Sequence, residues 1–295
     1  MQEDKWYIAY SFFMKRGEIE MKYSVLMSVY YKENPKWLEE SIKSMLNQTI
    51  KTNDFVLIED GQLTDELEKV VIKYEKKFPK IFNVVRLKEN QGLGPALAIG
   101  VKACKNEWIA RMDSDDYSVP DRIEKQFNAI KENPEIDMIG SSVAEFIDNI
   151  DNIQSYRLLP SSHEDIVKFS KKRNPFGHPS VLFKKSKVLE SGNYRKYHLV
   201  EDYDMWVRMI EHNTTCYNIP EILVYMRIGE DFYKRRGGIK YLKSILKFKT
   251  EQYRKHYYSL KDYVISSGSS IIACLVPNYI RKLIYKKILR KGVSK

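Results

Sequence analysis

A chain of 295 residues with 43% apolar side chains is long enough for one large domain with an appendage. Its three cysteines lie far apart, which argues against a disulfide scaffold and a cysteine metal site and fits a reducing compartment. No apolar run approaches the roughly 18 residues of a membrane-spanning helix, and no signal peptide is recognisable.

The net charge of +11 is distributed unevenly along the chain. Residues 232–295 carry 17 Lys and Arg against two acidic residues, which leaves 33 basic and 37 acidic residues in the rest. We therefore expect a mildly acidic body over residues 21–231 and a strongly basic tail over 232–295, each with its own partner.

Apolar runs that predict strands alternate with helical patterns along the first half. The predicted strands are 24–30, 55–58, 81–87 and 107–112, and the predicted helices begin at Pro35, near Leu67 and near residue 95. This alternation is typical of an α/β fold with a mostly parallel sheet. Ligands of such sheets bind at the carboxyl ends of the strands.

The pattern becomes mixed after residue 135. We expect strands at 136–140, at 143–147 and near Tyr156, and then a Pro- and Gly-bearing loop at 174–183 that enters another strand. A helix follows over 200–212, with Tyr203 and Trp206 on its apolar face.

Three carboxylates follow the strand at 107–112, in the stretch RMDSDDYSVPDR. Asp113, Asp115 and Asp116 lie so close together that each raises the pKa of the next. One interpretation is an acidic turn that caps the helix beginning near Pro120. The other is a site for a hard cation, because Mg²⁺ and Mn²⁺ bind carboxylates together with substrate phosphates.

Five segments, in order, resemble the family 2 glycosyltransferases. They are SVLMSVYYKENPKWLEESIKSMLNQT, FVLIEDG, NQGLGPALAIGVKACKNEWIARMDSDDYSVPDR, NPFGHPSVLF and EDYDMWVRM. The resemblance covers about residues 22–240 and is greatest to the bacterial members that build capsular, exopolysaccharide or lipopolysaccharide repeats. It implies the GT-A fold, a Rossmann-like nucleotide-sugar-binding domain with a central mixed sheet.

The resemblance also implies roles for individual residues. Asp202 would be the catalytic base, Asp60 would accept a hydrogen bond from uracil, and Asp115 would bind the metal ion with Asp113, which also lies near the ribose, or with Asp116. The nucleotide pocket would be lined by Ser28, Val29 and Tyr30, with Asn90 and Arg111 as further donor contacts. A simple helix cap remains the alternative for the Glu201–Asp202 pair.

Three further side chains allow two interpretations each. His178 would lie on the acceptor side together with Glu201, or would serve only as a hydrogen-bonding residue of its loop. Arg235 and Arg236 would reach over the donor diphosphate, with glycines beside them that allow close approach, or would simply begin the basic tail.

Together with these residues, the resemblance implies an inverting transferase that moves a sugar from a nucleotide diphosphate-sugar, most simply a UDP-sugar, to a lipid-linked oligosaccharide. A bound Mn²⁺ or Mg²⁺ would neutralise the diphosphate, and one carboxylate would take the proton from the acceptor hydroxyl. A catalytically silent sugar-nucleotide-binding subunit is the alternative, although the acid set is intact. A nucleotidyltransferase fits less well, because SVYYKENP is not a Gly-rich phosphate loop.

The basic tail predicts a peripheral location on the inner face of the cell membrane, in the cytoplasm. A helix beginning at Pro277 would place Ile280, Leu283 and Ile288 on one side and six basic residues, from Arg281 to Lys291, on the rest. Such a helix binds anionic lipid. The alternatives are a solvated helix packed on the body and, last, nucleic-acid binding, for which no module is recognisable.

Residues 1–20 have no counterpart in the family pattern. The codons of Lys15 to Glu18 could contain a ribosome-binding site just upstream of Met21. The expectation is that translation starts at Met21, and the alternative is an extra helix on the membrane side.

Overall fold

The computed structural model describes residues 22–229, 231–285 and 290–292. The N-terminal extension over residues 1–20 and the expected start at Met21 lie outside the described residues.

The first half of the chain forms a parallel sheet. Strand β1 (Tyr23–Val29) pairs in parallel with β2 (Asp54–Glu59) on one side and with β4 (Trp108–Arg111) on the other, and β2 pairs with β3 (Phe82–Arg86). The connections are the helices α2 (Pro35–Leu46), α3 (Asp65–Lys77) and α4 (Leu93–Ala103). Because the strands run in one direction, their carboxyl ends meet at one edge.

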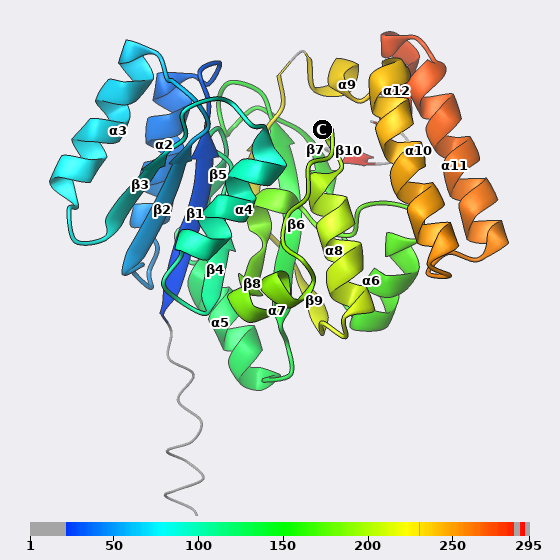
Figure 1. The fold of residues 1–295 in the computed structure, drawn as a ribbon, viewed down its shortest axis with the longest axis horizontal. Coiled ribbons are helices and arrows are strands. Elements are labelled where there is room, and N and C mark those ends of the chain that lie inside the picture. The colour runs from blue at the N-terminus through cyan, green and yellow to red at the C-terminus, as the bar shows by residue number, and fades with distance from the viewer. Residues whose placement is uncertain (1–21, 230, 286–289, 293–295) are drawn as a thin grey trace, which may run out of the picture.

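The second half continues the sheet with antiparallel pairs. Strand β8 (Leu182–Lys184) runs antiparallel between β4 and β6 (Met138–Phe146), and β7 (Ile153–Arg157) pairs antiparallel with β6. Strand β9 (Cys216–Arg227) is parallel to β6. With β10 (Lys291–Gly292) at one edge, the path of the sheet is β10-β7-β6-β8-β4-β1-β2-β3, so the predicted mixed α/β architecture is confirmed (Figure 1).

Helices cover both faces of this sheet and bury two apolar cores. Val25 and Met27 of β1 face α2, α3 and α5 (Arg122–Glu132), whereas Leu26 faces the opposite core. That second core is built from α4, α6 (His163–Ser170), α7 (Lys185–Glu190) and α8 (Glu201–Glu211). This alternation follows from the two-residue period of a strand.

Some elements differ from the sequence-based expectation. Residues 136–140 and 143–147 were expected as two strands, but β6 is one continuous strand that is buried throughout. Neither β9 nor the helices α6 and α7 were expected. Strand β9 contains Pro220, which is typical of loops and edges, and its register with β6 shifts near Ser141 and Ser142.

The basic tail forms helices that pack beside the sheet domain. Helix α9 (Asp231–Arg235) is followed by α10 (Gly238–Arg254), which packs on α8 through Ile245 and Phe248. Helix α11 (Leu260–Leu275) lies alongside α10 at the right-hand edge of Figure 1. The Ser-Gly run at 266–270 continues α11, where the Lys249 ammonium donates to Ser270 Oγ at 2.6 Å.

The predicted amphipathic helix is wrong in extent and in orientation. Helix α12 (Asn278–Ile284) ends before Lys291, because Lys291–Gly292 forms strand β10 on the edge of β7. Arg281, expected on the basic outer face, is buried and donates to three carbonyl oxygens at the end of α11, whereas Leu283 is 51% exposed. Ile288 lies outside the described residues.

Candidate active site

The acidic stretch, residues 113–116, lies between β4 and β5 (Tyr117–Ser118) at the carboxyl edge of the sheet. Ser41 Oγ donates to the backbone oxygen of Asp113 at 2.6 Å and ties the stretch to α2. Arg111 was expected to contact the donor, but it is buried behind Asp113 and pairs with its carboxylate. Arg111 does not line the cavity described below, and its ion pair makes it a residue that positions the Asp113 carboxylate.

The acidic stretch concentrates negative charge in a largely buried place. Burial, followed by the charges of Glu33 and Asp113, raises the pKa of Asp115 to about 8. Burial and the charge of Asp115 raise the pKa of Asp116 well above its usual value. Glu33, in the loop after β1, accepts a hydrogen bond of 2.6 Å from Ser114 Oγ and extends the acidic surface.

Arg227, at the end of β9, holds the acidic stretch from the other side. Its backbone N–H donates to Asp116 Oδ1 at 2.7 Å, and its Nε donates to the backbone oxygen of Asp115 at 2.9 Å. The guanidinium lies between the rings of Trp37 and Phe146, 4.7 and 4.5 Å from their centroids. The stacking holds the guanidinium in place for its hydrogen bond to the Asp115 backbone, and Asp116 Oδ2 is left without a hydrogen-bond partner.

The end of β1 contributes only two of its three predicted pocket residues. Ser28 and Tyr30 line the cavity described below, whereas Val29 is 1% exposed and belongs to the core beneath α2. The prediction for Val29 is corrected by strand alternation, since neighbouring side chains of a strand point to opposite faces.

Asp60, just after β2, organises the loop that follows β3. Its Oδ1 accepts from Gln91 N at 2.7 Å and its Oδ2 from Gly92 N at 3.0 Å, while Asn90 Nδ2 donates to the Asp60 backbone oxygen at 3.0 Å. Gly61 has φ of 86°, and a Cβ there would lie 2.6 Å from Asn90 N. The close approach of the two loops therefore requires glycine.

The opposite wall comes from the first turn of α8. Asp202 Oδ1 accepts from Tyr203 N at 2.7 Å, and its Oδ2 accepts from Asn174 Nδ2 at 2.6 Å. Burial raises the pKa of Asp202 above its usual value, and burial together with the Asp202 charge raises the pKa of Glu201 to about 7. A carboxylate with a raised pKa is a better proton acceptor, as a general base requires.

His178 lies between these walls, in the short helix η1 (His178–Ser180). Its Nε2 is 3.1 Å from the Tyr194 hydroxyl, and its ring packs near Trp206. Burial lowers the pKa of His178 well below its usual value, so the ring is neutral at pH 7.

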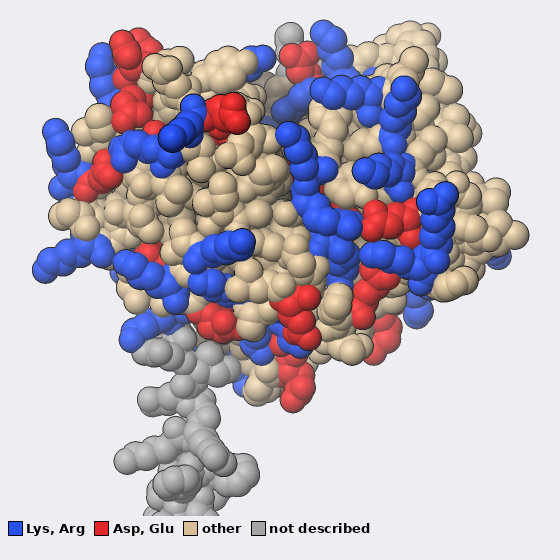
Figure 2. Space-filling view, viewed as in Figure 1, with Lys and Arg blue, Asp and Glu red and all other residues tan. Residues whose placement is uncertain are grey.

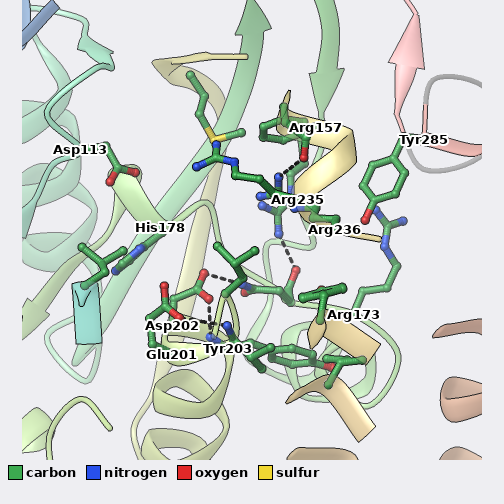
Figure 3. A pocket seen from close by; sticks show the side chains of 18 of the residues that line it. Asp113, Arg157, Arg173, His178, Glu201, Asp202, Tyr203, Arg235, Arg236 and Tyr285 are labelled. Carbon is green, nitrogen blue, oxygen red and sulfur yellow. Dashed lines mark hydrogen bonds between the residues drawn. The ribbon is translucent and has the colours of Figure 1, made fainter. Parts of the chain in front are cut away.

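One cavity of about 1470 Å³ brings most of the predicted residues together (Figure 3). Asp113 and Asp202 lie on different sides of His178 in this view. The predicted residues that line the cavity are Ser28, Tyr30, Asp60, Asn90, Asp113, Asp115, Asp116, His178, Glu201, Asp202, Arg235 and Arg236. Arg236 stacks on Phe232, 3.9 Å from the ring centroid, whereas the charge of Arg235 acts on Tyr30, near the acidic stretch.

The donor atoms of the acidic stretch suit a divalent cation that arrives with phosphate oxygens. Within the part of the chain that the structure describes, no three His, Cys, Asp or Glu side chains form a metal-ligand group. Mg²⁺ and Mn²⁺ need only one or two carboxylates when substrate phosphates complete the coordination. Asp116 Oδ2 is buried without a hydrogen-bond partner, and Asp115 faces the cavity.

Comparison with known protein families identifies the family of this chain. The family model described as glycosyl transferase family 2 matches residues 24–189, from β1 to α7. The chain belongs to this family.

Two relatives of this family 2 glycosyltransferase are named bacterial glycosyltransferases. It is 35% identical over 92% of its length to UDP-Gal:alpha-D-GlcNAc-diphosphoundecaprenol beta-1,3-galactosyltransferase of Escherichia coli, of which it covers 97%. It is 36% identical over 75% of its length to the amylovoran biosynthesis glycosyltransferase AmsE of Erwinia amylovora, of which it covers 82%.

Solved structures of glycosyltransferases share the fold of this enzyme. The mannosyltransferase PcManGT from Pyrobaculum calidifontis, solved with GDP-Man and Mn²⁺, matches with a TM-score of 0.58 at 13% identity, over 88% of this chain and 78% of that one. TarS residues 1–349 of S. aureus with UDP-GlcNAc matches with a TM-score of 0.54 at 16% identity, over 90% of this chain and 87% of that one. These matches establish the GT-A fold.

Three residues of the glycosyltransferase site were not predicted from the sequence. Glu33 and Asn174 belong to segments in which roles were assigned only to neighbouring residues. Arg227 ends strand β9, which was not expected. For Glu33 a signal existed, because the loop after β1 lies at a carboxyl strand end. Arg227 and Asn174 contact site residues that lie far from them in the sequence, so no local sequence pattern indicates their roles.

Proposed function

We propose that this glycosyltransferase moves a sugar from a UDP-sugar to a hydroxyl of a lipid-linked oligosaccharide, with inversion at the anomeric carbon. The observation that carries the proposal is that Asp202 and the acidic stretch line the same cavity from different walls (Figure 3). The E. coli relative, by its name, uses UDP-Gal and a diphosphoundecaprenol-linked sugar, which supports this substrate class.

Each wall has its own part in the proposed reaction. Asp202, held by Asn174 and Tyr203, accepts the proton of the acceptor hydroxyl as that oxygen attacks the anomeric carbon. Asp115, with Asp113 or Asp116, would hold Mn²⁺ or Mg²⁺, which when bound neutralises charge on the diphosphate. One displacement inverts the carbon and needs no protein nucleophile.

The donor side is tested by calorimetric titration with UDP in the presence of Mn²⁺ and again with EDTA. The proposal expects metal-dependent binding by the native protein, its loss in Asp115→Ala, and its retention in Asp151→Ala, a matched exposed carboxylate of the β6–β7 turn. Absence of UDP binding both with Mn²⁺ and with EDTA would overturn the donor assignment. UDP binding without transfer from any UDP-sugar would support the silent-subunit alternative.

We also propose that the tail helices rest on the inner face of the cell membrane. Among the described residues, no helix has both the length and the apolarity to cross a membrane. Helix α11 instead exposes a row of apolar side chains, Leu260, Val264, Ile265, Ile271, Ile272 and Leu275. Figure 2 shows a largely uncharged surface over α11, bordered by Lys and Arg. Apolar surface beside basic charge suits an interface with anionic lipid.

Sedimentation with vesicles tests this placement. The full chain is expected to bind vesicles containing anionic phosphatidylglycerol more strongly than neutral vesicles, and the double variant Val264→Ser/Ile272→Ser is expected to lose most of the binding. Leu189→Ser, which changes an exposed apolar residue on α7, is the control. Equal binding by both variants would contradict the role of α11.

A further inference from the structure

Three arginines gather on the cavity wall beyond Asp202. Arg157 ends β7, Arg173 lies in the loop after α6, and Arg290 precedes β10, so distant parts of the chain contribute to the cluster. All three line the cavity. In Figure 3, Arg157 and Arg173 lie on the side of Asp202 that is away from Asp113. We call these residues the arginine cluster.

Burial and mutual repulsion act on the charges of the arginine cluster. Arg290 Nε donates to Glu145 Oε1 at 2.7 Å, and Glu145 is fully buried. Arg157 Nη2 donates to the neutral backbone oxygen of Asn174 at 2.7 Å. Burial and the charges of the other two arginines lower the pKa of Arg157 to about 9, and burial and Arg290 lower that of Arg173. Such a group stabilises an anion with more than one charge.

Asn174 links the arginine cluster to the proposed base. The Asn174 side chain donates to Asp202 Oδ2, and its backbone oxygen accepts from Arg157. An anion on the cluster therefore lies on the acceptor side of Asp202, whereas the acidic stretch lies on the donor side (Figure 3).

The tail helices and the end of α12 also line the cavity. Their apolar contributions are Ile245, Ile265, Ile272, Ala273 and Ile284, and polar side chains such as Lys249 and Ser266 stand among them. The lining of this one cavity therefore includes carboxylate, guanidinium and hydrocarbon groups. A molecule that carries a sugar hydroxyl, a diphosphate and a lipid chain would find a suitable partner for each part.

We propose that the arginine cluster binds the diphosphate of a lipid diphosphate-linked acceptor and directs its lipid along α10 and α11. This inference rests on the proposed function and adds to it the acceptor class and the residues that recognise it. Guanidinium groups suit the task, because each forms paired, charge-assisted hydrogen bonds with phosphate oxygens.

The donor carries the same chemical group, so the test must separate two diphosphates. Calorimetry with UDP and Mn²⁺ reports the donor site. Calorimetry with geranyl diphosphate, in saturating UDP and Mn²⁺, reports the second site, and geraniol shows what the lipid alone contributes. The variants are Arg157→Gln, Arg157→Lys and Arg173→Gln. The control is Arg254→Gln, which changes an exposed arginine of α10.

The proposal expects Arg157→Gln and Arg173→Gln to weaken geranyl diphosphate binding by about tenfold or more, since each removes a charged hydrogen-bond donor. UDP binding should stay within about twofold of the native value, and Arg157→Lys should retain part of the affinity. Geraniol should bind weakly and equally to all variants. A thermal melt of each variant checks that it is folded. If Arg157→Gln is not folded, the binding measured with Arg173→Gln tests the proposal.

Weakened UDP binding with unchanged geranyl diphosphate binding would assign the arginines to the donor and overturn the inference. Unchanged binding of both ligands would overturn it as well. If the native protein binds UDP but not geranyl diphosphate, this inference fails while the proposed function stands. If it binds neither UDP nor any other nucleotide, the proposed function fails by a separate readout.

Discussion

Asn174 donates a hydrogen bond of 2.6 Å from its side-chain amide to Oδ2 of Asp202. Together with the backbone N–H of Tyr203, which donates to Oδ1, this contact fixes both oxygens of the carboxylate. The first turn of α8 thereby presents Asp202 to the cavity in one orientation. Both donors stabilise the charged form and oppose the effect of burial on its pKa.

Replacing the base tests this arrangement directly. Asp202→Asn keeps the shape of the side chain but cannot accept a proton, so we expect kcat to fall by about 100- to 10,000-fold. The affinity for UDP and Mn²⁺ should not change, because the acidic stretch is intact. Initial rates of UDP release with the preferred donor and acceptor measure the first quantity, and calorimetry the second. A variant with more than half the native rate would exclude Asp202 as the base.

Removing the amide partner should act through the pH profile. Asn174→Ala deletes a hydrogen bond to the ionised carboxylate, so the pKa of Asp202 should rise further. The base must be deprotonated to act, and the acid limb of kcat/KM should therefore move to higher pH. Activity lost at neutral pH should return in part under alkaline conditions. An equal loss at every pH would point to a structural role instead, and Asn152→Ala in an exposed turn is the control.

Glu201 makes stability depend on pH. Its pKa in the fold is about 7 rather than 4.5, so the folded state holds its proton more tightly than the unfolded state. Stability from this group is complete below pH 4.5 and is lost as pH rises through 7. Glu201→Gln is neutral at every pH and should be more stable than the native protein at alkaline pH by up to about 3 kcal/mol, and equal to it in acid.

Urea unfolding near pH 5 and near pH 8 measures this difference. Glu135→Gln, at an exposed position, should show no comparable dependence. A Glu201→Gln variant that is less stable than the native protein at both pH values would show that the carboxylate is a net stabilising contact.

Arg281 should be important for the stability of the tail helices. Its guanidinium donates to Ala273, Cys274 and Val276 oxygens at 2.8, 3.0 and 2.7 Å, which satisfies the last carbonyls of α11. Arg281→Met leaves these buried oxygens unpaired and should lower the free energy of unfolding by about 2–4 kcal/mol. Lys282→Met, the exposed neighbour, should change it little. Urea unfolding of both variants checks the contrast.

The sequence allowed prediction of those features that depend on neighbouring residues. Apolar runs located β1 to β4, and the acidic residues that follow β2 and β4 do lie at the carboxyl edge of the sheet. Strand β6 was misjudged because it is buried on both faces and so lacks the alternation of polar and apolar side chains. Val29 and Arg111 were misassigned because motif membership says nothing about which way a side chain points.

The remaining features depend on residues far apart in the chain. Arg227 contacts Asp116 across 111 positions, and Arg290 contacts Glu145 across 145, so no local pattern announces either pair. The tail illustrates the same limit. Its helical spacing was visible, but Arg281 turned inward because the carbonyls at the end of α11 needed donors.

The pairing of β10 with β7 links the last described residues to the middle of the chain. During synthesis, the strands on either side of the acidic stretch can assemble long before Arg290 leaves the ribosome. The ion pair between Glu145 and Arg290 can form only afterwards. A chain cut by a protease ahead of Arg290 would lose the arginine that forms the direct ion pair with the buried carboxylate of Glu145. Such a chain would have a folded parallel sheet, β1 to β4, but an incomplete cavity wall around Glu145.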